Sequence, residues 1–322
     1  MDPLSDILAL LKVRSFVSGR LEIGGRWSFG FGPHEGIKFQ AITRGEGWLV
    51  VQGEAPVRIR AGDCFLLPRG RPFHMTCDLD LPPVDAMSLI PANRDASGLT
   101  RMQGGDDFHS FGGYFDLDGD HAGLLLAELP AVVHVRGEAD RADLRWCLER
   151  MRREMIQAQP GGALVGQQLA MMVLVQALRL HLEDRIAQAK ARGAGSGAGA
   201  GAAGDAPGWL TALADPQVAA ALGALHAEPA RRWTLEALAA QAAMSRTVLA
   251  TRFKALVGAA PMAYLARWRM TLAASRLADG AESVGAIALS LGYESESAFS
   301  TAFKRHMGRA PRAWARGRAL AA

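Results

Sequence analysis

The sequence predicts a multidomain protein with an N-terminal β-barrel followed by two helices, and a C-terminal domain built only of helices. Three features of the 322-residue chain lead to this division: a pattern that repeats at a separation of 50 residues near the C-terminus, short apolar runs broken by Gly and Pro near the N-terminus, and a Gly/Ala-rich stretch between them. A composition of 49% hydrophobic and 21% charged residues is ordinary for globular proteins, and this chain length favours two domains.

The Gly/Ala-rich stretch covers residues 193–208. Residues of this kind have almost no side chain to bury, so the stretch is expected to be a flexible linker. The predicted domains are therefore residues 1–192 and 209–322. Such a linker transmits little torque, so communication between the domains would need direct contact, dimer geometry or a raised local concentration.

Short strands are expected between residues 17 and 89. Apolar runs alternate there with turn residues, which is typical of an antiparallel barrel or sandwich. A short amphipathic helix over residues 4–11 precedes them. The runs cover residues 26–31, 39–42, 48–51, 57–59, 64–67 and 73–77.

Two helices with long apolar seams are expected after the strands. One small barrel can hardly cover both seams, so we expect these helices to pair two copies of the chain. The alternative is that the seams pack only on each other and on the barrel. The seams are Leu144, Leu148, Met151 and Met155 in the first helix, and Met171, Val175, Leu178 and Leu182 in the second.

The repeated pattern indicates two copies of one structural unit. Ser245 and Ser295 each stand where a helix N-cap is wanted, and apolar residues follow both at helical spacing. A shorter helix is expected before each cap, over 234–242 and 283–291, so each copy is a helix, a turn and a second helix. A helix over about 261–279 joins the copies.

The ends of the two units also match. Gly258 and Gly308 suit a left-handed helix C-cap, and Pro261 and Pro311 open the next segments. The residues that carry the repeat, Leu-Gly-Tyr-Glu-Ser-Glu-Ser-Ala-Phe-Ser-Thr-Ala-Phe-Lys at 291–304, closely resemble the signature of the AraC/XylS family of bacterial transcription regulators. The resemblance covers about 209–316 and implies a DNA-binding domain with two helix-turn-helix motifs. A helical bundle without a nucleic acid partner is the alternative.

The N-terminal part resembles the cupin-type sensor domain found in one branch of this family. Gly45-Glu46-Gly47-Trp48-Leu49 and the segment 68–74 resemble two barrel motifs. The resemblance implies a barrel that holds a small, partly apolar effector. The expected effector-binding residues are Phe39, Gln40, Trp48, Phe65, Phe73 and His74, although the aromatic rings could simply fill the barrel.

A cupin enzyme needs several His and carboxylate ligands that converge on one metal. The segment 38–45 offers no pair of His, and Gln40 stands about where this branch often carries one, which leaves His74 alone at a ligand position. We therefore expect no metal, no cofactor and no catalytic residue. An enzyme fused to a DNA-binding module is the weaker alternative.

Each recognition helix is expected to enter a major groove, with the two helices about 34 Å apart along the duplex. Arg246 can contact guanine with two hydrogen bonds, while Ala250 and the Thr methyl groups suit thymine. Thr251 and Thr301 replace the Arg that the family often has there, so base selection is weaker or differently placed. The predicted DNA-binding residues are Arg246, Thr247, Ala250, Thr251, Arg252 and Lys254 in the first copy, and Glu296, Ser297, Ser300, Thr301, Lys304 and Arg305 in the second.

Charge supports this interpretation independently. Residues 209–322 carry 14 Lys and Arg against 7 Asp and Glu, a net charge of +7, whereas residues 1–208 carry 22 against 25, a net charge of −3. A basic domain beside a nearly neutral one is typical of DNA binding. Cys64, Cys77 and Cys147 have no disulfide or metal spacing and are expected to be buried thiols.

The expected function is a sequence-specific transcription regulator that binds promoter DNA, senses a small molecule and forms a homodimer. No stretch is expected to span a membrane, and the opening residues lack the features of a secretory signal, so a cytoplasmic location is predicted. An activator of this kind would also contact RNA polymerase. The main alternative is an effector-free regulator whose barrel only dimerises.

Overall fold

A computed structural model describes residues 2–10, 13–116, 129–136, 142–157, 159–193 and 208–319. Contacts divide the chain into two compact units. The sheet unit consists of Val13–Asp118 and Leu129–Asp184. The helical unit contains the first helix of the chain and the residues from Arg185 onward. Of the predicted linker 193–208, residues 194–207 lie outside the described residues.

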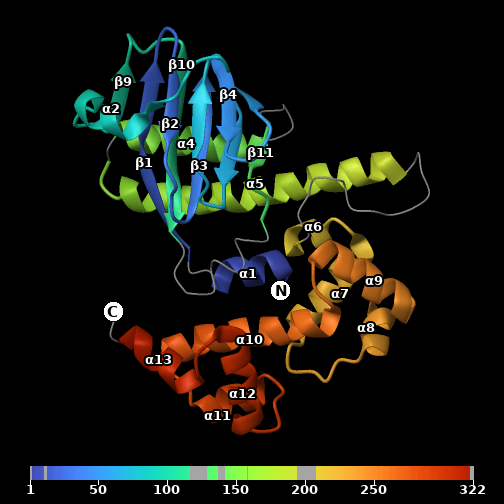
Figure 1. Ribbon diagram of the computed structural model, residues 1–322. Helices are drawn as coiled ribbons and strands as arrows, with labels where there is room; N and C mark the ends of the chain where they lie inside the picture. The colour runs from blue at the N-terminus through green and yellow to red at the C-terminus, as the bar shows by residue number, and fades with distance from the viewer. Residues whose placement is uncertain are drawn as a thin grey trace. The chain divides into compact units, whose positions relative to one another are not determined.

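The sheet unit contains two sheets (Figure 1). The six-stranded sheet has the order β11-β6-β3-β10-β1-β9, and the five-stranded sheet has the order β5-β4-β7-β2-β8. Neighbouring strands are antiparallel except for β1 with β9 and β2 with β8. The strands are β1 Arg14–Ile23, β2 Ser28–Phe31, β3 Ile37–Arg44, β4 Glu46–Val51, β5 Val57–Arg60, β6 Cys64–Leu67, β7 Phe73–Thr76, β8 Val84–Asp85, β9 Leu99–Met102, β10 Phe108–Asp116 and β11 Val133–Val135. Helix α2 (Ala86–Asn93) follows β8.

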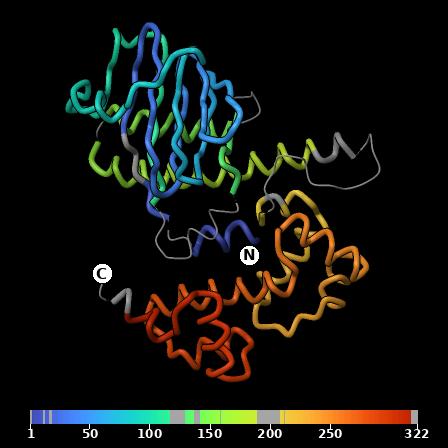
Figure 2. Tube along the Cα trace, in the orientation of Figure 1, coloured from blue at the N-terminus to red at the C-terminus, as the bar shows by residue number. Residues whose placement is uncertain are grey.

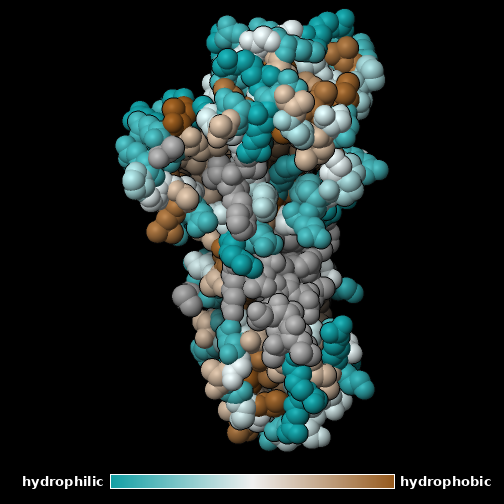
Figure 3. All heavy atoms as spheres, turned by 90° about the vertical axis from the view of Figure 1, so that its left-hand side faces the viewer, coloured by the Kyte–Doolittle hydropathy of each residue, from teal (hydrophilic) through white to brown (hydrophobic). Residues whose placement is uncertain are grey.

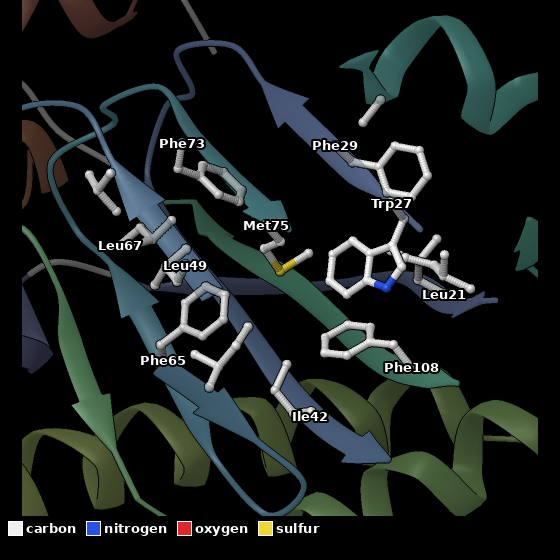
Figure 4. Packing of buried hydrophobic residues seen from close by; sticks show 14 of the residues in the cluster. Leu21, Trp27, Phe29, Ile42, Leu49, Phe65, Leu67, Phe73, Met75 and Phe108 are labelled. Carbon is white, nitrogen blue, oxygen red and sulfur yellow. The ribbon is translucent and has the colours of Figure 1, made fainter. Parts of the chain in front are cut away.

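The core of the sheet unit lies between the two sheets (Figure 4). Ile42 and Phe65 from the six-stranded sheet meet Leu49, Phe73 and Met75 from the five-stranded sheet. Each of these side chains is at most 6% exposed. The predicted class, a small antiparallel barrel or sandwich, is thus confirmed, and its interior is filled by side chains.

Helices α4 (Ala142–Gln157) and α5 (Gly162–Gly193) follow the strands and cross one side of the six-stranded sheet (Figure 1). The Ser15 hydroxyl on β1 donates a hydrogen bond of 2.8 Å to the Gln167 carbonyl oxygen on α5. The outer side of this sheet therefore also carries a buried layer, in which the Phe39 and Phe115 rings lie 5.3 Å apart.

Most of the α4 seam and one residue of the α5 seam lie inside this layer. Met151 is 0% exposed and Leu178 is 1% exposed, so a charge at either position would disrupt the core of one subunit. Other apolar residues are exposed instead. These are Trp146 and Ile156 on α4, and Leu164, Val165 and Met172 on α5.

Helix α5 corrects one expectation from the sequence. No stretch was expected to be able to span a membrane, but Gly162–Gln188 has the necessary length and a hydropathy of 1.4 in its most apolar 18-residue window. The same helix buries Val173 and Leu174 completely in the sheet unit. Because a core helix meets the same criterion of length and composition, we interpret α5 as a packing helix.

The helical unit contains two helix-turn-helix motifs and the helix that joins them (Figure 2). Helix α10 runs between the motifs, and its bounds equal the predicted 261–279. The helices are α1 Pro3–Leu10, α6 Trp209–Leu213, α7 Pro216–Ala227, α8 Leu235–Gln241, α9 Arg246–Val257, α10 Pro261–Asp279, α11 Val284–Ser290, α12 Glu296–Met307 and α13 Pro311–Ala319.

The first helix of the chain, α1, packs on α7 within the helical unit. Ile7 is fully buried, and an Asp6 carboxylate oxygen lies 3.3 Å from His226 Nδ1. His226 also stacks on Trp268, with ring centroids 4.0 Å apart, and shares a 2.8 Å hydrogen bond with the Tyr264 hydroxyl. Burial lowers the pKa of His226 to about 4, so this ring is neutral at ordinary pH.

Figure 3 shows one face of the molecule, on which hydrophobic residues are interspersed with hydrophilic ones. Isolated apolar side chains on a surface are normal, so this face alone indicates no partner.

Candidate nucleic-acid interface

Both helix-turn-helix motifs are built by the same local devices. The hydroxyls of Ser245 and Ser295 accept hydrogen bonds from Val248 N and Ala298 N, which caps α9 and α12. At the other end of α9, Gly258 takes a left-handed conformation with a φ of 83° and donates its N–H to the Lys254 carbonyl oxygen. The predicted caps are thus confirmed, together with the repeat.

Each recognition helix buries one stripe and exposes the other. Leu249 and Phe253 of α9 are fully buried, as are Phe299 and Phe303 of α12. Phe303 meets Trp314 of α13 edge to face, with ring centroids 5.8 Å apart. Ten of the twelve predicted DNA-binding side chains are exposed, and Ala250 and Ser300 are half-buried at the edge of the stripe.

The exposed basic residues differ in how strongly they are already paired. Arg246 forms an ion pair with Glu236 of α8, and Arg252 contacts the Asp215 carboxylate at 2.5 Å. Lys254, Lys304 and Arg305 have no ion pair within the described residues. These three are therefore the more available phosphate contacts. An Arg that is already paired must first give up its carboxylate partner, and this loss reduces the free energy that it gains from a phosphate.

Glu296 brings a negative charge to the start of the second recognition helix. It is paired with Arg312 of α13 at 3.1 Å, which partly neutralises it. A carboxylate at this position can accept a hydrogen bond from cytosine, whereas Arg246 at the matching position of α9 can only donate. Thr301 donates its hydroxyl to the Ser297 carbonyl oxygen, so this side chain is already engaged within the helix.

A junction that sequence reasoning missed holds the two motifs together. Arg269 of α10 donates hydrogen bonds to the carbonyl oxygens of Pro229 and Arg231, at 2.6 and 2.9 Å, and its guanidinium lies 5.8 Å from the centre of the Tyr293 ring. Burial lowers the pKa of Arg269 from its ordinary value. This role of Arg269 could not be predicted from the sequence, because a loop 40 residues away supplies its partners.

Gly292 completes this junction in the turn of the second motif. Its φ is +82°, and a Cβ placed there would lie 2.2 Å from the Ala230 carbonyl oxygen. The loop before α8 thus lies against the turn before α12, which joins the first motif to the second.

The predicted effector residues are divided between different surfaces. Phe65 and Phe73 lie in the core between the sheets, and Gln40 donates a 2.8 Å hydrogen bond to the Ser110 hydroxyl. Three of the expected effector residues do not line the interior between the sheets, where a barrel would hold its ligand. Phe39 packs with Phe115 on the helix side of the sheet, Trp48 lies outside the interior cluster 5.2 Å from the Arg58 guanidinium, and His74 faces away from the core.

The surface that His74 does line is a hollow of about 510 Å³ beside β2, β4 and β7. Val50 of β4 and Gln52, which follows β4, share it, together with Asp85, which caps α2. Burial lowers the pKa of His74, so the ring is mostly neutral at ordinary pH.

Metal and thiol chemistry find little support in the residues described. No group of three or more His, Cys, Asp or Glu in those residues could hold a metal ion. Cys64 and Cys147 are buried, and Cys77 is half-buried. Burial raises the pKa of the Cys64 thiol to about 12, which makes it a poor nucleophile.

Two helix-turn-helix motifs with exposed, partly basic recognition helices, beside a separate sheet unit, define a two-domain DNA-binding protein. Residues 2–183 match a family described as cupin, and residues 238–317 match one described as helix-turn-helix domain. A putative AraC-like transcription regulator of Streptomyces lividans is 42% identical over 97% of both chains. The HTH-type transcriptional regulator AlkR of Acinetobacter baylyi is 28% identical over 97% of this chain and 98% of its own.

A solved structure, the DNA-binding domain of AdpA in complex with a target DNA, is 34% identical. That match covers 32% of this chain and 92% of the other, with a TM-score of 0.30. The chain belongs to the AraC-like transcription regulators with an N-terminal cupin-type domain.

Proposed function

We propose that this regulator binds promoter DNA as a cytoplasmic homodimer and responds to a small molecule held by residues 1–192. Residues 209–322 would bind the DNA, and residues 193–208 would form the flexible connection. The observation that carries this proposal is the pairing of the Arg269–Gly292 junction with two exposed recognition helices. The protein would act without catalysis, cofactor or membrane, and as an activator it would also contact RNA polymerase.

The base-reading side chains follow from their positions near the start of each recognition helix. Arg246, Thr247, Ala250 and Thr251 would face bases in one groove, and Glu296, Ser297, Ser300 and Thr301 would face bases in the next. Five basic residues would contact phosphates, which position the protein without selecting sequence: Arg252, Lys254, Lys304, Arg305 and Arg309.

Binding of an effector is tested by the thermal stability of the full-length protein against a library of small metabolites. A ligand that binds only the folded protein stabilises it by about 2.7 kcal/mol at a hundredfold excess over Kd. We expect at least one compound to raise the melting temperature in a saturable way and to change the affinity for operator DNA.

The filled space between the sheets favours a second candidate, in which the sheet unit only dimerises. In that case no metabolite would stabilise the protein, while operator DNA still would. One set of melting curves, with metabolites and with operator DNA, therefore distinguishes a sheet unit that binds an effector from one that only dimerises.

Dimer formation is predicted from the exposed apolar residues of α4 and α5. Leu164 is 61% exposed, Met172 is 44% exposed and Trp146 is 59% exposed, and a second copy of the chain would cover them. We expect the full-length chain to sediment as a dimer at micromolar concentration, and the double variant Leu164→Asp, Met172→Asp to sediment as a folded monomer.

The matched control is Gln167→Asp, which adds a charge to the same helix at an exposed polar position. It should remain dimeric. The monomeric double variant should bind a pair of operator sites about a hundredfold more weakly and a single site equally well, because only paired sites profit from tethering. A wild-type chain that sediments as a monomer would contradict this account.

A further inference from the structure

One lysine of the sheet unit, Lys38, is half-buried among aromatic rings. Lys38 on β3 extends its ammonium group over the aromatic rings at the end of the five-stranded sheet, 4.8 Å from the centre of the Phe31 ring and 5.2 Å from that of Phe73. The two rings are stacked 4.7 Å apart at an angle of 10°. Lys38 is half-buried and has no acidic partner in the part of the chain that the structure describes.

Such a lysine is costly, because burial removes water from a charge that no anion compensates. Burial accordingly lowers the pKa of Lys38, while the aromatic faces recover part of the loss. One negative charge placed beside this half-buried ammonium group would compensate its positive charge.

A second polar group without a partner lies beside it. His34 Nε2 is buried and makes no hydrogen bond within the described residues, while Nδ1 is 3.4 Å from the Glu35 carbonyl oxygen. The His34 ring meets the Phe73 ring edge on, with centroids 6.2 Å apart. Burial, and to a smaller extent the positive charge of Lys38, lower the pKa of His34, so its ring is neutral and carries a proton on one nitrogen only. In the tautomer with that proton on Nε2, Nε2 can donate a hydrogen bond, and the long 3.4 Å contact of Nδ1 with Glu35 is then not a hydrogen bond.

The loop that holds His34 has little freedom to move. Its backbone N–H donates to the Gly70 carbonyl oxygen at 3.1 Å, and a Cβ on Gly70, whose φ is +64°, would lie 2.3 Å from the His34 carbonyl oxygen. The Lys38 ammonium and the His34 ring therefore both lie against Phe73, and the contacts with Gly70 position His34 there. Phe31, Phe73 and Pro72 also line the hollow of about 510 Å³, and they supply apolar surface near this group.

We propose that this end of the sheet unit binds a small organic acid, whose carboxylate pairs with Lys38 and accepts a hydrogen bond from His34 Nε2 while its apolar body lies against Phe31 and Phe73. The inference rests on the proposed sensing function and specifies its ligand class. A carboxylate satisfies both unpartnered groups at once, whereas a neutral ligand leaves the Lys38 charge uncompensated.

The test uses the full-length protein with three carboxylates, benzoate, hexanoate and octanoate, each compared with its neutral amide. Calorimetry and melting curves should show saturable binding of at least one carboxylate, with the amide at least tenfold weaker. Lys38→Met keeps the length of the side chain without its charge and should weaken that carboxylate about tenfold to a hundredfold, since a charge-assisted hydrogen bond is lost. Lys38→Arg should retain most of the binding.

Folding of the variants is checked without ligand. Lys38→Met removes an uncompensated charge, so its melting temperature should equal or exceed that of the wild type, and its affinity for DNA should be unchanged. Equal binding of acid and amide, undiminished binding by Lys38→Met, or no binding of any of the three carboxylates to the wild type would overturn the proposal. A neutral metabolite that stabilises wild type and Lys38→Met alike would leave the sensing function standing and refute only the acid site.

Discussion

The affinity of the full-length chain for its DNA is expected to fall several hundredfold between about 50 and about 200 mM salt, because each neutralised phosphate releases counterions. Five basic side chains of the recognition helices and their ends are the candidate phosphate contacts: Arg252, Lys254, Lys304, Arg305 and Arg309. Five contacts correspond to a slope of about −4.5 in a plot of log affinity against log salt. Fluorescence anisotropy with labelled duplex measures this slope directly.

Single substitutions show which residues contribute to the salt dependence of DNA binding. Arg305→Ala should reduce its magnitude by about 1 and weaken binding to all sequences alike. Arg44→Ala is the control, because Arg44 is an exposed arginine of the sheet unit paired with Asp106 at 2.7 Å, and it should leave the slope unchanged. A flat salt response of the wild type would remove phosphate contact as the main source of affinity.

Replacement of Gly292 by Ala should damage the DNA-binding domain more than any other single methyl group added to it. The left-handed conformation at φ +82° and the 2.2 Å approach to the Ala230 carbonyl oxygen both oppose a Cβ. We expect a loss of about 2–4 kcal/mol in the free energy of unfolding, measured by urea denaturation. The loop before α8 must then move away from the turn before α12.

DNA binding by the Gly292→Ala variant distinguishes a positioning role of the Arg269–Gly292 junction from a general loss of stability. If the junction sets the placement of the two recognition helices, Gly292→Ala should weaken binding to a site spanning two grooves while leaving the weak binding to one groove nearly intact. Gly223→Ala is the control, because Gly223 lies within α7 with nothing within 4 Å of its Cβ position, and it should stabilise the helix by about 0.5–1 kcal/mol. Equal loss at both kinds of DNA site would contradict the junction.

The sequence predicted the helical unit well because its signals are local. Ser245 and Ser295 cap their helices through hydrogen bonds to residues only three positions away, and Gly258 and Gly308 end the same helices. These elements can therefore be placed from local sequence without any distant contact. The Arg269 junction escaped because its partners lie about 40 residues away, and no local pattern announces such a contact.

The sheet unit was harder for a physical reason. β3 lies between two buried layers, the interior cluster and the layer that contains Phe115. Its first five residues do alternate, with Ile37, Phe39 and Ala41 buried and the residues between them half-buried, but this alternation does not tell which of the two layers each set faces. An error of one position moves a side chain to the opposite face, which is what happened to Phe39. The expectation that a second copy of the chain covers the α4 seam met a similar difficulty. Apolar spacing marks a buried face of a helix without identifying what buries it.

Helix α1 adds a consequence for how the protein is made. Its fully buried Ile7 and the contact between Asp6 and His226 belong to the helical unit, although the strands β1–β11 come between α1 and α7 along the chain. The sheet unit is thus inserted into the helical one. During synthesis the ribosome releases α1 first and its partner helix only after all the strands, so the strands can fold early while α1 waits with its apolar side uncovered. The contact between α1 and α7 can therefore form only after all the strands of the sheet unit have been synthesised.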